Sequence, residues 1–152
     1  MRHLRTARLL TAAALIVPAS LAGWAAAGPA SAAVAPASCA TLSGAGLNST
    51  LTNCTDPANT GGKGTAVSKV TTGTNGTTTI KWNKTGTTTL SFSYVIVKAN
   101  KCAKGLTEIT ETGKVTGGTG AAIKSIPKGQ KTSATVCEGK TVALLKGTKF
   151  VL

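Results

Sequence analysis

Histidine, acidic residues and aromatic residues are all scarce in this chain of 152 residues. It has a single histidine, His3, four acidic residues, and an aromatic content of 3%. His3 lies in an N-terminal segment whose removal we expect, which leaves no imidazole for a serine–histidine–acid triad or for most zinc hydrolase sites. The small number of acids also disfavours a glycosidase, because that chemistry needs a pair of carboxylates. The composition therefore predicts a protein that is not an enzyme.

The positions of the four acidic residues agree with that prediction. Glu108 and Glu111 are three positions apart, so on a regular strand they point to opposite faces of a sheet. Glu138 adjoins a cysteine near a turn, and Asp56 precedes a proline in a stretch typical of a loop. We expect all four to be solvated carboxylates that balance lysines.

Residues 1–32 have the form of a secretory signal peptide. Three arginines and no acid precede a long apolar stretch, and Ala30-Ser31-Ala32 has the small residues that signal peptidase requires. We predict cleavage after Ala32, a disordered leader over 33–38, and a single secreted β domain over 39–152. An uncleaved anchor is the alternative, but an alanine-rich stretch inserts weakly into a bilayer. We therefore expect an extracellular or envelope-associated protein with no stable membrane anchor after cleavage.

Cleavage leaves a domain in which every cation is a lysine. The 17 basic residues include three arginines, all in the signal, so 14 lysines remain against four acids, a formal charge of about +10. Such a surface attracts polyanions. Lysine is a hydrated point charge and lacks the planar fork with which arginine contacts phosphate or guanine. We expect no sequence-specific recognition of nucleic acid.

Two groups of lysines are the densest along the chain, and we take them as candidate anion-binding residues. They are Lys98, Lys101 and Lys104, and then Lys124, Lys128 and Lys131. The expected ligand is an anionic polymer of the cell wall or the extracellular space. A simpler explanation is that the lysines keep a threonine-rich sheet soluble and protect its edges from pairing with other chains.

A second class of function is a protein-binding or inhibitor module. Residues 55–64, next to Cys54, would then form a disulfide-framed loop that inserts into a protein partner. The sequence does not indicate an oligomeric state.

The four cysteines, Cys39, Cys54, Cys102 and Cys137, predict two disulfides, because an even number in a small secreted domain indicates a disulfide framework. Of the possible pairings we favour Cys39–Cys54 with Cys102–Cys137, since each joins cysteines that are near in sequence. The cysteines have no C-x-x-C spacing, so we expect neither a metal site nor a cofactor.

Alternation of polar and apolar residues predicts an all-β domain. It is clearest over 86–98, and over 77–83 just upstream, with a hairpin turn at 83–86 between the two strands. Weaker strand candidates are 49–54, 63–70, 106–115, 132–138, 141–145 and 148–152. About seven or eight short strands with glycine-rich turns predict an antiparallel β-sandwich, immunoglobulin-like or similar, and the alternative is a small closed β-barrel.

The apolar residues of these strands form the predicted core. They are Leu47, Leu51, Val67, Val70, Ile80, Trp82, Leu90, Phe92, Tyr94, Ile96, Ile109, Val115, Ile123, Ile126, Val136, Val142, Leu144 and Phe150.

Residues 117–120, Gly-Gly-Thr-Gly, follow a predicted strand in the way that a phosphate-binding loop does. However, Gly120 is followed by two alanines instead of the Lys-Ser or Lys-Thr pair of a nucleotide-binding loop. We predict a bend or a β-bulge here.

Overall fold

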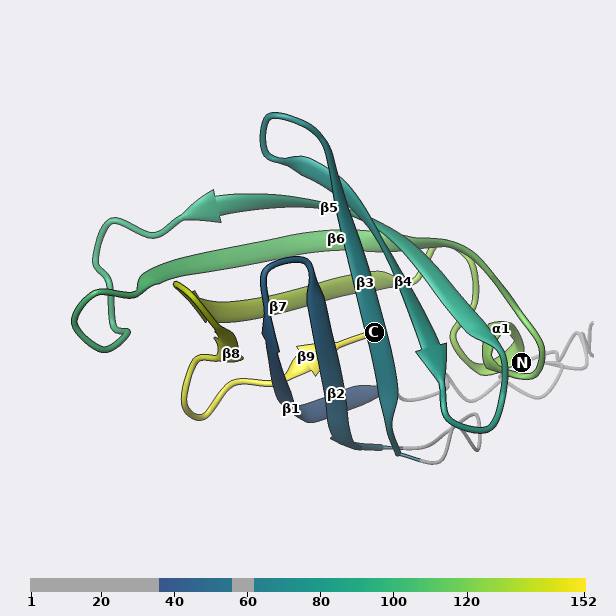
Figure 1. Ribbon diagram of the computed structural model, residues 1–152. Coiled ribbons are helices and arrows are strands. Elements are labelled where there is room, and N and C mark those ends of the chain that lie inside the picture. Colours follow the sequence, from purple (N-terminus) through teal and green to yellow (C-terminus); the bar gives the residue numbers. More distant parts are fainter. Residues whose placement is uncertain (1–35, 56–61) are drawn as a thin grey trace, which may run out of the picture. The chain divides into compact units, whose positions relative to one another are not determined.

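The computed structural model describes residues 36–55 and 62–152 (Figure 1). The predicted signal peptide lies outside these residues and stays a prediction. Within the described part, the chain forms β1 (Ser38–Ala45), β2 (Asn48–Cys54), β3 (Gly64–Thr72), β4 (Asn75–Trp82), β5 (Thr87–Ile96), β6 (Thr107–Thr119), α1 (Ala122–Ser125), β7 (Lys131–Glu138), β8 (Val142–Leu144) and β9 (Phe150–Val151).

The strands form a closed antiparallel barrel. From β1 to β8 each strand pairs with the next along the chain, and β1 closes the ring by pairing with both β8 and β9. Each of β1 to β7 therefore has hydrogen-bonded neighbours on both sides. The all-β, antiparallel prediction is confirmed. The closed barrel matches the alternative architecture, whereas the favoured sandwich is not confirmed.

The strongest strand prediction is also confirmed. β4 and β5 pair antiparallel, with a register that runs from Asn75 opposite Ser93 to Lys81 opposite Thr87. β1 is the strand that the sequence analysis missed, because its small residues show little alternation. It begins at Ser38, and Ala37 before it is already buried, so the packed part of the domain starts before Cys39.

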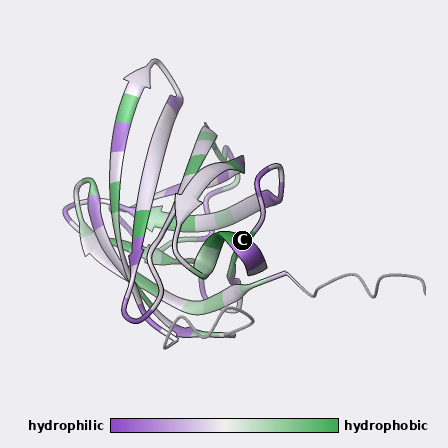
Figure 2. Ribbon diagram, turned by 90° about the vertical axis from the view of Figure 1, so that its right-hand side faces the viewer, coloured by the Kyte–Doolittle hydropathy of each residue, from purple (hydrophilic) through white to green (hydrophobic). Residues whose placement is uncertain are grey.

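Side chains that point into the barrel form the core. Among the predicted core residues, these are buried: Leu51, Ile80, Trp82, Leu90, Phe92, Ile109, Val115, Ile126, Val136 and Phe150. Tyr94, Ile123, Val142 and Leu144 are partly buried against them. Figure 2 shows the pattern as green apolar bands on pale, threonine-rich strands.

Four predicted core residues are exposed instead: Leu47, Val67, Val70 and Ile96. Val67 alternates with the buried Ala66, so it points outward. Ile96 has the inward phase of β5, but β5 pairs with β4 only as far as Ser93, so Ile96 extends beyond the barrel and is 63% exposed. Leu47 and Val70 lie at the open end of the barrel.

The other end of the barrel is covered by α1. Ala122 and Ile126 are fully buried there, and the Ala122 amide donates a hydrogen bond to the carbonyl of Thr85 in the β4–β5 turn, at 3.1 Å. The bend predicted within 117–120 precedes this helix, at Gly120, which has a φ of 66°. A left-handed conformation of this kind favours glycine. The β5–β6 register also shifts between Thr89 and Leu90, which places a bulge at Thr116, just before the predicted range.

Two glycines accommodate Phe92: Gly76 leaves space for its ring, and Gly113 lets β6 approach the backbone of β5 closely. Gly76 and Gly113 lie directly opposite Phe92 on the two neighbouring strands. A Cβ added to Gly76 would lie 2.4 Å from Cζ of Phe92, and one added to Gly113 would lie 2.1 Å from the carbonyl oxygen of Ser91. The absence of side chains at these positions lets the strands bend closely around the core.

Both favoured disulfides are present. Cys39 and Cys54 lie opposite each other on β1 and β2, and Cys102–Cys137 ties the segment between β5 and β6 to β7. Two disulfides are compatible with an extracellular protein. In residues 36–55 and 62–152, no helix is long and apolar enough to cross a membrane.

Candidate functional site

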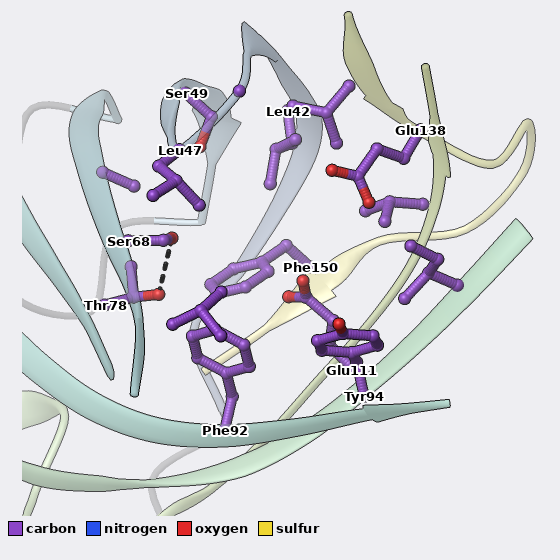
Figure 3. Close-up of a pocket in the computed structure, with 16 residues that line it drawn as sticks. Leu42, Leu47, Ser49, Ser68, Thr78, Phe92, Tyr94, Glu111, Glu138 and Phe150 are labelled. Carbon is purple, nitrogen blue, oxygen red and sulfur yellow. Dashed lines mark hydrogen bonds between the residues drawn. The ribbon is translucent and has the colours of Figure 1, made fainter. Parts of the chain in front are cut away.

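A cavity of about 130 Å³ lies at the end of the barrel opposite α1 (Figure 3). Its walls include inward-facing apolar side chains of β1, β5, β6, β7 and β9: Leu42, Phe92, Tyr94, Ile109, Val136 and Phe150. Leu47, in the β1–β2 turn, and Val70, near the end of β3, line its mouth and are 49% and 42% exposed. A small closed barrel with space between its inward side chains can hold a small ligand.

Two carboxylates project into this cavity. Glu111 comes from β6, where it shares the inward phase of Ile109 and Val115, and it is partly buried. Glu138 is the last residue of β7 and is exposed to solvent, as the sequence predicted. Figure 3 shows both carboxylates turned toward the space between the strands. Burial raises the pKa of the Glu111 carboxyl above its ordinary value, and the nearby Glu138 carboxylate raises it further.

The prediction of solvated carboxylates is wrong for Glu111 and Glu108. Glu111 is partly buried in the cavity, and Glu108 is 4% exposed. The two side chains do point to opposite sides of β6, as their spacing predicted. Glu108 lies on the outer side but is covered by the segment between β5 and β6, whose Lys101 amide donates a hydrogen bond of 2.6 Å to Oε2 of Glu108. Asp56 lies outside the described residues.

The outer face of β4 to β7 carries a second, much wider hollow. It is a shallow groove of about 900 Å³, lined mainly by residues of these strands, together with Thr71 of β3, Gly129 and Val151 of β9. Two cross-strand rows form its floor. One row runs Thr77, Ser91, Lys114 and Lys131, and the other runs Asn75, Ser93, Thr112, Ser133 and Val151. The groove therefore presents hydroxyl groups beside two lysines.

Lys114 and Lys131 are direct partners in the β6–β7 ladder. Both side chains are exposed. Like charges directly opposite each other on neighbouring strands destabilise a sheet. This arrangement is unfavourable for the isolated domain, and an anion placed between the two ammonium groups would relieve it.

Among the six predicted anion-binding lysines, Lys131 lines the groove. Lys128 is next to Gly129, another groove residue, and Lys124 belongs to α1. Lys98, Lys101 and Lys104 lie in the segment between β5 and β6, away from the residues that line the groove. Their role in anion binding stays a prediction. Lys114 was not among the residues predicted from the sequence, because only the β6–β7 register places it opposite Lys131.

The alternative binding loop, residues 55–64, lies largely outside the described residues, since 56–61 are not described. Its role stays a prediction.

Comparisons with family models, with curated proteins and with solved structures found no match to this chain. In the described part of the chain, no group of three or more histidine, cysteine, aspartate or glutamate residues is arranged to hold a metal ion.

Proposed function

We propose that this protein is a small non-enzymatic binding domain, secreted or held at the cell envelope, that binds anionic polymers on the outer face of its barrel. The observation that carries the proposal is the groove across β4 to β7, in which Lys114 and Lys131 lie directly opposite each other among threonine and serine hydroxyls. A sulfate, phosphate or carboxylate group between them would accept hydrogen bonds from both lysines and from nearby hydroxyls.

The separation of charges supports this proposal. The three described acidic side chains do not line the groove: Glu111 and Glu138 line the cavity, and Glu108 is buried under the segment between β5 and β6. The two lysines of the groove therefore meet a passing polyanion with no acidic side chain among the described residues that line it. Such a field raises the association rate of an oppositely charged partner.

Protection of sheet edges does not account for Lys114. This residue is paired with Ser91 of β5 on one side and with Lys131 of β7 on the other. Edge protection by lysine serves strands that have unpaired backbone groups. Because lysine gives weak, hydrated contacts, we expect binding that depends strongly on salt and little on the detailed structure of the polymer.

Retention on immobilised heparin and on anionic polymer isolated from cell envelopes tests the proposal. We compare the wild-type protein with the double variant Lys114→Gln/Lys131→Gln. The matched control is Lys140→Gln/Lys146→Gln, which removes the same charge from two exposed lysines that do not line the groove.

We expect the groove variant to elute at clearly lower salt. The slope of log binding constant against log salt concentration should be smaller in magnitude by about two, one for each lost lysine contact. The control should change retention much less. Elution of the wild type at very low salt, or equal losses in the two double variants, would contradict the proposal, because the groove would then have no special part in retention.

A further inference from the structure

We propose that the internal cavity is a separate binding site for a small primary alkylammonium ion, whose charge lies between the carboxylates of Glu111 and Glu138. This inference goes beyond polyanion binding and uses the opposite charge, a different set of residues and the inner side of the barrel. It rests on the size of the cavity, the sign of its charge and the apolar character of its walls.

The size of the cavity limits the ligand. An apolar protein cavity of about 150 Å³ holds benzene, so a cavity of similar size has room for about six non-hydrogen atoms. The cavity at the open end of the barrel has a volume of about 130 Å³. A short alkyl or cyclic amine fits such a space, whereas a nucleotide or a sugar chain is too large.

The charge of the cavity selects a cation. Glu111 and Glu138 bring carboxylates to it, and no lysine is among the described residues that line it. Figure 3 draws a hydrogen bond between Ser68 and Thr78, whose hydroxyl oxygens are 2.8 Å apart, but none from either carboxylate to the other lining residues. Both carboxylates therefore have free acceptor capacity toward a ligand in the cavity.

The apolar walls distinguish an alkylammonium from a metal ion. Ca²⁺ takes about six to eight oxygen ligands, and Mg²⁺ usually keeps several waters. Two carboxylates cannot complete either shell, and the additional water would have to lie against Phe92, Phe150 and Leu42. A primary alkylammonium instead brings three donors for the carboxylates and a hydrocarbon part for the buried rings. The ring of Tyr94, beside Glu111 in Figure 3, adds an aromatic surface that favours a cation.

The burial of Glu111 also agrees with a cationic ligand. Its carboxylate has lost part of its hydration, as the raised pKa indicates, and its neighbour Glu138 repels it. An ammonium group between the two would offset both effects. Leu47 and Val70, exposed at the mouth, would contact any part of the hydrocarbon that extends out of the cavity.

Calorimetric titration of the purified protein with n-pentylammonium chloride tests this inference at about neutral pH. 1-Pentanol is the uncharged analogue, pentanoate is the anionic one, and methylammonium lacks the hydrocarbon part. We expect n-pentylammonium to bind, 1-pentanol and methylammonium to bind at least about tenfold more weakly, and pentanoate not to bind.

Variants then assign the site. Glu111→Gln and Glu138→Gln should each weaken n-pentylammonium binding by about tenfold or more. Ser49→Trp should abolish it, because Ser49 is an inward residue that lines the cavity. Lys114→Gln/Lys131→Gln should leave amine binding unchanged, and the two glutamine variants should keep their retention on heparin. A cooperative thermal unfolding transition checks that the glutamine variants are folded.

Four outcomes would overturn the inference. They are no measurable binding of n-pentylammonium, equal affinity for 1-pentanol, unchanged affinity in both glutamine variants, and displacement of the amine by Ca²⁺ at a similar concentration. The lysine and glutamate variants act on different sites. Failure of amine binding would therefore not contradict polyanion binding, and failure of heparin binding would not contradict amine binding.

Discussion

Glu111 occupies an environment that a carboxylate alone would not favour. It points inward from β6 among apolar side chains, close to a second carboxylate. Burial removes water from its charged form, and Glu138 repels that charge, so the pKa of Glu111 is raised from its ordinary value of 4.5. A residue that costs stability at neutral pH is often kept for binding.

The raised pKa makes a prediction about stability and pH. The folded protein holds the Glu111 proton to a higher pH than the unfolded chain does, so the free energy of unfolding falls as the pH rises from about 4.5 through the folded pKa. The loss is complete above that pKa. Glu111→Gln removes the charge, so it should stabilise the protein at pH 7 and have little effect near pH 3.5, where the wild-type side chain is neutral.

Thermal unfolding of wild type and Glu111→Gln between about pH 3.5 and pH 8 measures this difference. The melting temperatures should diverge as the pH rises, with the variant higher. A constant difference over the whole range would show that the substitution acts through packing and that Glu111 does not titrate abnormally.

At the scale of the strands, the curvature of β4, β5 and β6 depends on glycine opposite Phe92. Gly76→Ala would place a methyl group 2.4 Å from Cζ of Phe92 and 2.6 Å from the carbonyl oxygen of Lys69. We expect a loss of about 1–3 kcal/mol in the free energy of unfolding, the usual cost of overpacking a core. Denaturant unfolding measures it.

Gly117→Ala is the matched control for this substitution. Gly117 also lies in a strand, but a Cβ added there has no neighbour within 4 Å. We expect a change within about 0.5 kcal/mol. Equal effects at the two positions would mean that the cost comes from glycine's general backbone properties and not from contact with Phe92.

Alternation in the sequence predicts the strands well and the barrel poorly. The pairing of β4 with β5 follows from two alternating segments and a short turn, so local sequence is sufficient for it. Closure depends on β1 pairing with β8 and β9, which lie about a hundred residues away along the chain. No sequence pattern in these strands specifies which of them pair. A sandwich and a closed barrel built from the same strands would therefore show the same alternation in the sequence.

The candidate sites also divide into one that local sequence could predict and one that depends on strand pairing. Glu111 has the same phase as Ile109 and Val115, both expected in the core, so its inward direction was readable from the sequence. The general preference of carboxylates for water led to the opposite prediction. The Lys114–Lys131 pair, in contrast, depends on the β6–β7 register, which no local pattern specifies.

At the scale of the whole domain, the charges are separated by the wall of the barrel. Lysines face outward on β6 and β7, while Glu111 and Glu138 line the internal cavity. With few outer acids to compensate, the lysines repel one another, and this repulsion is screened by salt. Raising NaCl from about 0.01 M to about 0.5 M, which shortens the Debye length from about 30 Å to about 4 Å, should therefore raise the melting temperature.

Lys131→Glu tests whether the repulsion has a functional cause. The change places opposite charges across the β6–β7 ladder, so at low salt it should raise the free energy of unfolding by roughly 0.2–1 kcal/mol. It should also reduce the dependence of the melting temperature on salt. The same change should weaken retention on heparin more than Lys146→Glu, which alters an exposed lysine that does not line the groove. If Lys131 only kept the domain soluble, Lys131→Glu would raise the free energy of unfolding but would reduce retention on heparin no more than Lys146→Glu does. A lysine that binds the polymer is distinguished by a rise in stability together with a larger loss of retention.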